Sequence, residues 1–247
     1  MRFGILIVGD EILSGRRQDR HLPHAIETLA RRGRRLWWAH VVGDDPAQLT
    51  RQLREIRASS DSCFSFGGIG ATPDDLTRQC VAAAYEVALE RHAGALAEIE
   101  AQYGAEAWPN RVLMADLPQG ARLIPNPVNR VPGFSLGQLH CLPGFPHMAW
   151  PMMEWVLDYE YAGLAPDLPS HASVVVLDVA ESTLIPWMNA FVQRHPDLKL
   201  FSLPRTIPDG TREIELGVAG EASAAHAALR EIKQMLDSAG HRYREAT

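Results

Sequence analysis

The glycine-rich segment that begins at residue 67 has the composition best suited to chemistry. Three of its first four residues are glycine, namely Gly67, Gly68 and Gly70, with Ile69 between them. Glycine adopts positive φ angles and lets the backbone approach a ligand closely, so that successive N–H groups can point at an anion. We therefore expect this turn to bind a phosphate group.

The residues after the glycines favour the start of a helix. Thr72 is suited to be the N-cap, Pro73 the first helical residue, and Asp75 the acidic partner three positions after the cap. A helix that begins here would direct its positive end toward the same phosphate, with Thr72 among the ligand-binding residues. A second carboxylate, Asp74, would repel that phosphate unless a cation lies between them.

Three predicted strands position this segment and further acids. Residues 3–8, 36–42 and 63–66 are short apolar runs, separated by helical patterns at residues 22–32 and 49–56. This alternation predicts right-handed βαβ units and a parallel sheet, whose strands place their carboxyl ends along one edge. The acids that follow the three strands are Asp10 and Glu11, Asp44 and Asp45, and Asp74 and Asp75.

Acids gathered beside a phosphate site indicate a divalent metal such as Mg²⁺, Mn²⁺ or Co²⁺. The ligands that we expect for it are Asp10, Glu11, Asp44 and Asp74. For two of the six acids a simpler role stays open: Asp45 caps a helix begun by Pro46, and Asp75 completes a capping box.

The rest of the first domain contributes one more candidate loop. We expect a helix over residues 76–103, a short strand over 138–142 and a helix over 148–161. Between them, residues 126–133 form a loop that proline and glycine fix without regular structure. Its predicted ligand contacts are Asn126, Arg130, Pro132 and Gly133, and Asn129 offers a further donor. A turn with solvated polar side chains is the alternative.

A new series of strand and helix patterns begins after a linker at residues 162–170. Two domains are expected, 1–165 and 172–247, and the second has the order βαββα of a small α+β domain. Its segment 217–220 matches the GxxG of RNA-binding KH modules. That segment follows a strand instead of joining two helices, and the domain has no basic face, so RNA is not expected as a partner.

Composition narrows the functional class. The chain has 247 residues, 46% of them hydrophobic, and a net charge of −6, which disfavours nucleic acid or an anionic membrane as the main partner. Its three cysteines are widely spaced and indicate reduced core thiols in a cytoplasmic protein. There is no signal-peptide pattern and no apolar run of the roughly 18 residues that a membrane span needs. Neither a Walker A loop nor the Rossmann spacing is present.

Together these segments resemble the competence/damage-inducible protein A (CinA) family, whose first domain is a molybdopterin-binding (MoCF) domain. The matching segments, which span about the first 150 residues in family order, are 9–15, 42–45, 67–75, 126–133 and 143–146. The resemblance implies a three-layer α/β domain followed by a degenerate KH-like module. It also implies catalytic carboxylates at Asp44 and Asp75.

Several positions depart from the family pattern. The sequence Asp19-Arg20-His21 replaces the usual Asp, one residue, Asn, while Ala71 replaces a proline and Met148 stands where Glu is common. We expect no counterpart of the deamidase domain of longer relatives, and therefore no deamidation.

Three classes of function remain open. The leading hypothesis is a metal-dependent enzyme that hydrolyses a nucleotide pyrophosphate, of the ADP-ribose or FAD type. The second is a protein that binds molybdopterin or a nucleotide without turnover, and the third is a scaffold whose site has decayed. In the first two, the partner is a small phosphorylated ligand, and the protein is expected to be a homo-oligomer.

Overall fold

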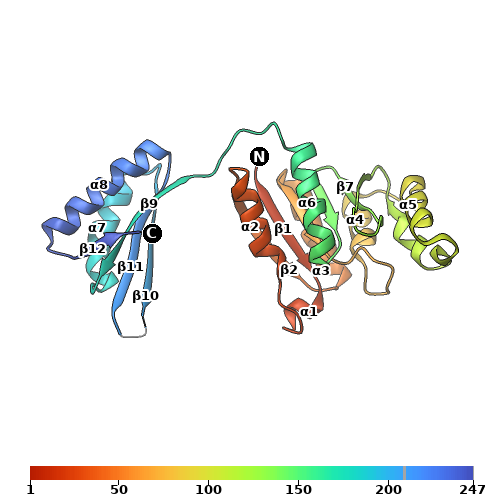
Figure 1. The fold of residues 1–247 in the computed structure, drawn as a ribbon, viewed down its shortest axis with the longest axis horizontal. Helices are drawn as coiled ribbons and strands as arrows, with labels where there is room; N and C mark the ends of the chain where they lie inside the picture. Colours follow the sequence, from red (N-terminus) through yellow and green to blue (C-terminus); the bar gives the residue numbers. More distant parts are fainter. Residues whose placement is uncertain (208–209, 247) are drawn as a thin grey trace. The chain divides into compact units, whose positions relative to one another are not determined.

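The computed structural model describes residues 1–207 and 210–246. It divides into two compact units, Met1–Asp167 and Leu168–Thr247 (Figure 1). The division falls within the segment 162–170, where the sequence predicts a linker. Within the described part of the chain, no helix is long and apolar enough to cross a membrane.

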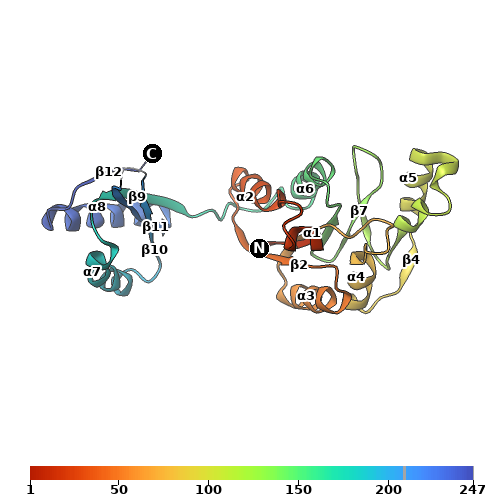
Figure 2. The ribbon, with the colours of Figure 1, turned by 90° about the horizontal axis from the view of Figure 1, so that it is seen from below.

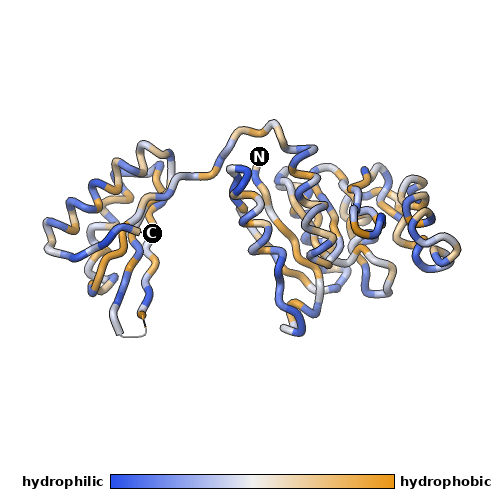
Figure 3. The backbone as a smooth tube through the Cα atoms, in the orientation of Figure 1, coloured by the Kyte–Doolittle hydropathy of each residue, from blue (hydrophilic) through white to orange (hydrophobic). Residues whose placement is uncertain are grey.

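A six-stranded sheet forms the centre of the first unit, in the order β2-β1-β3-β8-β7-β6. The four strands β2, β1, β3 and β8 are parallel, β7 runs antiparallel to them, and β6 pairs antiparallel with β7. The strand bounds are β1 Phe3–Val8, β2 Leu36–Val42, β3 Ser62–Phe66, β6 Arg122–Ile124, β7 Gly133–Leu136 and β8 Leu139–Leu142. Every residue of β1 is buried, as expected for an apolar run in the middle of a parallel sheet (Figure 3).

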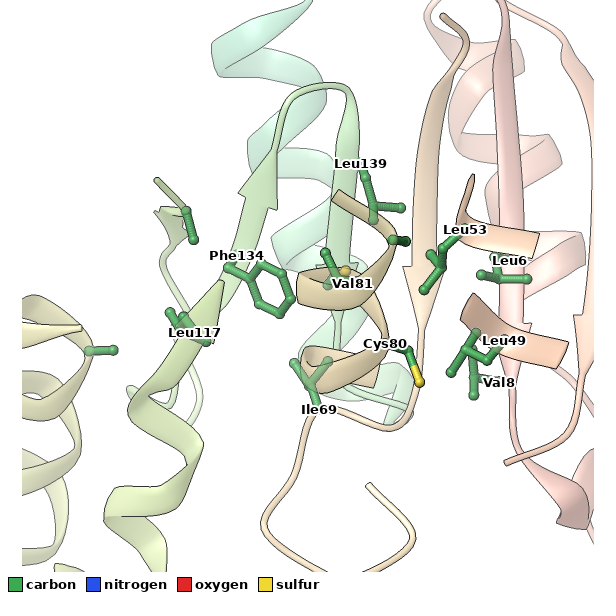
Figure 4. Packing of buried hydrophobic residues seen from close by; sticks show 14 of the residues in the cluster. Leu6, Val8, Leu49, Leu53, Ile69, Cys80, Val81, Leu117, Phe134 and Leu139 are labelled. Carbon is green, nitrogen blue, oxygen red and sulfur yellow. The ribbon is translucent and has the colours of Figure 1, made fainter. Parts of the chain in front are cut away.

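Helices cover both faces of this sheet, which confirms the three-layer α/β fold (Figure 2). One face packs against α2 (His21–Arg31) and α6 (Pro146–Glu160), and the other against α3 (Pro46–Ser59) and α4 (Thr77–Tyr85). Figure 4 shows the core under α3 and α4, with Leu49 and Leu53 on the side of Cys80 and Phe134 on the side of Val81. The three cysteines are all free and buried.

The single helix predicted over residues 76–103 is wrong. The chain leaves α4 at Glu86, which has a left-handed φ of 60°, and then forms β4 (Leu89–Arg91) and α5 (Ala93–Tyr103). The next elements are η1 (Gly104–Ala107), η2 (Arg111–Ala115) and β5 (Asp116–Pro118), which pairs with β4. The alanine-rich composition favours helix throughout, but the pairing of β4 with β5 overrides that local preference.

The second unit is a four-stranded antiparallel sheet in the order β10-β11-β9-β12, with two helices. Alternate residues of β9 and β11, such as Val174 and Leu216, pack with residues from both helices in one core. The short β12 is an element that the predicted βαββα order lacks. The elements are β9 Ser170–Leu177, α7 Glu181–Arg194, β10 Lys199–Thr206, β11 Arg212–Gly220, α8 Ala222–Ser238 and β12 Tyr243–Glu245. The GxxG segment lies inside β11, where Gly217 leaves room for Phe201 and Ser173.

Candidate functional site

A cavity of about 740 Å³ lies at the carboxyl ends of β1, β2, β3 and β8. This is the edge of a parallel sheet at which ligands generally bind in open α/β folds. The lining residues used below are Glu11, Arg16, Arg17, Asp44, residues 67–72, Asp74, Asp75, Tyr103, Met114, Asn126, Asn129, Val131, Phe145 and Met148. The structure therefore brings the predicted glycine turn and much of the predicted acidic rim to one place.

The glycine turn needs glycine for steric reasons. Gly67 and Gly68 have φ angles of 106° and 68°, and a Cβ on Gly67 would lie 2.3 Å from the carbonyl oxygen of Val8. A Cβ on Gly68 would lie 2.3 Å from Oγ1 of Thr77. That hydroxyl donates to the carbonyl oxygen of Gly67 over 3.0 Å, and the Thr77 N–H donates to that of Gly68 over 2.9 Å. The first turn of α4 thus holds the glycine turn in position.

Four consecutive backbone donors on this turn are free. The N–H groups of residues 68–71 have no hydrogen-bond partner within the part of the chain that the structure describes. Buried or half-buried N–H groups are rarely left without a partner, and a run of them forms an anion-binding concavity. The run includes Gly68, Ile69 and Gly70, where the sequence predicts a phosphate site, and that site stays a prediction.

The predicted role of Thr72 as a helix N-cap is wrong, because α4 begins at Thr77. Thr72 and Asp75 do form the expected reciprocal contacts, but they close a separate turn. The Thr72 N–H and hydroxyl donate to Oδ2 of Asp75 over 2.9 and 2.5 Å, and the Asp75 N–H donates to the Thr72 carbonyl oxygen over 3.0 Å. A capping-box pattern therefore stabilises a turn here and does not start a helix.

The loops after β1 and β2 are joined by two aspartates. The Asp10 N–H donates to Oδ2 of Asp44 over 3.0 Å, and the Asp44 N–H donates to Oδ1 of Asp10 over 3.2 Å. Asp10 begins the four-residue helix α1 (Asp10–Leu13) and does not line the cavity, whereas Asp44 does. Asp45 caps α3 by accepting from the N–H of Gln48 over 2.7 Å, as the capping alternative expects.

The electrostatic environment differs between Asp44 and Asp74. Partial burial raises the pKa of Asp44, and the charges of Asp10, Glu11 and Asp74 raise it further, against a lowering by the hydrogen bond from Asp10. The nearby Thr72 side chain lowers the pKa of Asp74, which is fully exposed. The crowding of negative charge is therefore greatest at Asp44.

The predicted metal ligands do not form a complete set. Among the described residues, no three His, Cys, Asp or Glu side chains are close enough to hold one ion. Glu11, Asp44, Asp74 and Asp75 nevertheless line the same cavity. Carboxylate oxygens beside a phosphate site suit Mg²⁺, which is commonly held by one or two carboxylates together with phosphates of the ligand.

The loop at residues 126–133 reaches the cavity only in part. Asn126 and Asn129 line it, but the Asn126 amide is used inside the loop, donating to Oδ1 of Asn129 over 2.8 Å and accepting from the N–H of Val128 over 3.0 Å. Arg130 is paired with Glu98 at the surface, with 2.8 Å between Nε and Oε2. The structure does not bring Arg130, or the buried Pro132 and Gly133, to the cavity.

Two kinds of lining residue were missed from the sequence. One is the pair Arg16 and Arg17, which follows Gly15 at the end of the first matching segment. Two adjacent arginines beside a predicted acidic rim were a readable signal of anion binding. The other is a set of apolar side chains from distant segments, which no local pattern could identify: Tyr103, Met114, Val131, Phe145 and Met148.

Comparison with known families agrees with the fold of the first unit. Residues 4–162 match the family described as "Probable molybdopterin binding domain" (MoCF). The first unit is therefore a MoCF domain, the class of fold that the sheet order and the strand-end cavity define.

Comparison with individual proteins identifies the family more narrowly than the domain match does. The chain is 36% identical over 190 residues to a CinA-like protein of Anaeromyxobacter sp. (strain K), covering 74% of this chain and 46% of that protein. It is 29% identical over 242 residues to protein Ta0487 of Thermoplasma acidophilum, covering 96% and 93%. A solved structure of CinA with unknown function from T. acidophilum matches with a TM-score of 0.59 at 30% identity, covering 64% of this chain and 98% of that one. The chain belongs to the CinA family, and it spans about half the length of the CinA-like protein.

Proposed function

We propose that the cavity binds a phosphorylated heterocyclic small molecule, with molybdopterin as the first candidate. The observation that carries this proposal is the run of four unpaired N–H groups at residues 68–71, on a turn held open by Gly67 and Gly68. Such a turn offers several donors to one phosphate at no cost in side-chain entropy. The family match supports molybdopterin, since the family is named for that ligand.

The remaining part of the cavity suits a flat ring. Tyr103, Met114 and Met148 offer an aromatic ring and two polarizable thioethers. The guanidinium of Arg111 lies 4.5 Å from the centre of the Tyr103 ring, and this cation–π contact restrains the ring. Aromatic and thioether groups pack well against heterocycles, while the neighbouring Asn129 can supply a polar contact.

The glycine turn provides the direct test. Gly68→Val should reduce the affinity for phosphorylated ligands by at least about tenfold, because its Cβ would displace Thr77 and distort the run of N–H groups. Gly120→Val is the matched control, since Gly120 has a φ of 83° with only one contact, at 3.9 Å, and does not line the cavity. Binding is measured by calorimetry with molybdopterin, ADP-ribose and FAD. Equal affinity in folded Gly68→Val and Gly120→Val would exclude the turn as the phosphate site.

A second candidate function is metal-dependent hydrolysis of a nucleotide pyrophosphate such as ADP-ribose or FAD. It is favoured by the four carboxylates that line the same cavity. A divalent ion held by one or two of these carboxylates together with the phosphates of the ligand would supply a Lewis acid at the phosphate. Asp44 and Asp75 are the candidate catalytic groups, and partial burial raises the pKa of Asp44, as suits a general base.

Turnover separates the two candidates. ADP-ribose and FAD are incubated with the protein, with and without Mg²⁺, Mn²⁺ or Co²⁺, and the release of mononucleotides is followed by chromatography. Metal-dependent release that is lost in Asp44→Asn supports hydrolysis. Binding of either ligand without release in any metal would leave only the binding function.

A further inference from the structure

The loop after α1 is held in a defined conformation next to the cavity. Gly15 takes a left-handed φ of 72°, which reverses the chain after the short helix. The Arg17 N–H then donates to the carbonyl oxygen of Glu11 over 3.0 Å. Because Glu11 itself lines the cavity, this hydrogen bond fixes the backbone of Arg17 at the cavity edge.

Arg16 and Arg17 both line the cavity, and neither side chain has an ion-pair or hydrogen-bond partner in the described ranges 1–207 and 210–246. Several other arginines of the same unit are paired, as Arg32 is with Asp158 over 2.8 Å and Arg122 with Glu160 over 2.9 Å, whereas Arg51 and Arg54, outside the cavity, have no such partner among the described residues. Glu11, Asp44, Asp74 and Asp75 line the same cavity, yet the two arginines form no ion pair with any of them. Two guanidinium groups are thus free to bind an anion that enters the cavity.

These arginines lie on the β1 side of the glycine turn. Sheet order places β1 directly beside β3, whose end carries the turn, and neighbouring strands lie about 4.8 Å apart. The cavity therefore offers two different anion-binding features at adjacent strand ends: backbone N–H groups after β3 and guanidinium groups after β1. Guanidinium groups match the paired oxygens of a phosphate and bind it in a bidentate manner.

We propose that Arg16 and Arg17 form a second anion-binding site, which binds the outer phosphate of a ligand with two linked phosphates. The inference rests on the proposed function, because it assumes that the inner phosphate lies on the glycine turn. A diphosphate spans the two strand ends, and its second group brings the extra negative charge that the arginines neutralise. The arginines thereby favour a diphosphate over the corresponding monophosphate, while a ligand with one phosphate, such as molybdopterin, still binds at the glycine turn.

The test compares ADP with AMP, which differ by one phosphate. Affinities are measured by calorimetry in a single buffer that contains Mg²⁺. Wild-type protein should bind ADP more tightly than AMP by about tenfold or more, and the double variant Arg16→Gln/Arg17→Gln should lose most of this preference while its affinity for AMP changes less than about twofold. Arg51→Gln/Arg54→Gln is the matched control, since both residues are exposed on α3, outside the cavity, and carry the same change in charge.

The outcomes distinguish a failure of the second anion-binding site from a failure of the proposed phosphate-binding function. A preference for ADP that survives in the Arg16→Gln/Arg17→Gln variant, or that is lost equally in the control, overturns the second site and leaves the phosphate-binding function standing. Wild-type protein that binds neither nucleotide, nor any of the ligands used to test Gly68→Val, overturns the proposed function and this inference with it.

Discussion

At the scale of single residues, the reciprocal hydrogen bonds between Asp10 and Asp44 decide how the acidic rim behaves. They place two carboxylates together, and burial and the neighbouring charges raise the pKa of Asp44. A group whose pKa is raised by folding contributes stability that is present below its ordinary pKa and is lost as the pH rises through the folded value. Ionised Asp44 therefore opposes folding at neutral pH.

Asp44→Asn should accordingly leave the protein as stable as wild type at pH 7 or raise its free energy of unfolding by up to about 0.5 kcal/mol, because the amide oxygen can still accept from the Asp10 N–H. The difference in the free energy of unfolding should vanish at about pH 3. This pH lies below the reference pKa of aspartate, so Asp44 is protonated in both the folded and the unfolded state. Urea unfolding at the two pH values measures it. Asp45→Ala is the contrast, with an expected loss of about 1 kcal/mol, since Asp45 caps α3. A large loss in Asp44→Asn at pH 7 would contradict the charge-crowding argument.

At the scale of elements, the buried side chain of Arg78 connects the glycine turn to the segment around η2 and β5. It is 4% exposed, and its guanidinium donates to the carbonyl oxygen of Gly70 over 2.6 Å, to that of Asp116 over 3.1 Å and to that of Leu113. Desolvation lowers the pKa of this guanidinium, against a raising by the charges of Asp116 and Asp75. Arg78 thus holds the phosphate side and the ring side of the cavity together.

Replacing this arginine should affect stability and binding together. Arg78→Met leaves three carbonyl groups without their donor, so we expect a loss of about 2–4 kcal/mol in the free energy of unfolding, measured in urea. Arg78→Lys keeps the charge but lacks the planar fork, and it should fold while binding phosphorylated ligands more weakly than wild type. Wild-type affinity in a folded Arg78→Lys variant would show that the guanidinium does not position the turn.

At the scale of the whole molecule, the cavity belongs to one unit alone. All of its lining residues fall between Val8 and Met148, and the first unit, Met1–Asp167, has its own two cores. The second unit has a separate core from β9, β11, α7 and α8. Ligand binding should therefore need only the first unit.

A chain of residues 1–167 should fold alone and bind phosphorylated ligands within about twofold of the affinity of the full chain. Limited proteolysis of the full chain should cut within residues 162–170 before any other segment, because few contacts restrain a linker. Calorimetry and mass spectrometry of the fragments test the two statements. An insoluble 1–167 chain, or first cuts elsewhere, would mean that the two units depend on one another for folding.

Local sequence was sufficient for the framework of the site. The apolar runs at residues 3–8, 36–42 and 63–66 predict β1, β2 and β3, and the glycines after residue 66 predict a turn of left-handed backbone. These features depend on side-chain pattern and on φ angles that only glycine adopts readily, and both are local properties. For the same reason, Asp45 could be identified as an N-cap from its neighbours alone.

Tertiary structure decided which residues share the cavity. Whether Thr72 begins a helix depended on Thr77, whose hydrogen bonds to Gly67 and Gly68 set the start of α4 further along the chain. Arg130 was drawn to Glu98, a residue 32 positions away, and so left the site that its own loop predicts. Arg16 and Arg17 lie at the cavity because of the turn at Gly15. Tyr103 and Met114 also line it, although Tyr103 was predicted to end a long helix and Met114 lies beyond that helix. Sequence determined the strands, the glycine turn and the caps, because their causes lie within a few residues. Which side chains line the cavity was decided by contacts between distant segments, and these contacts exist only once the chain has folded.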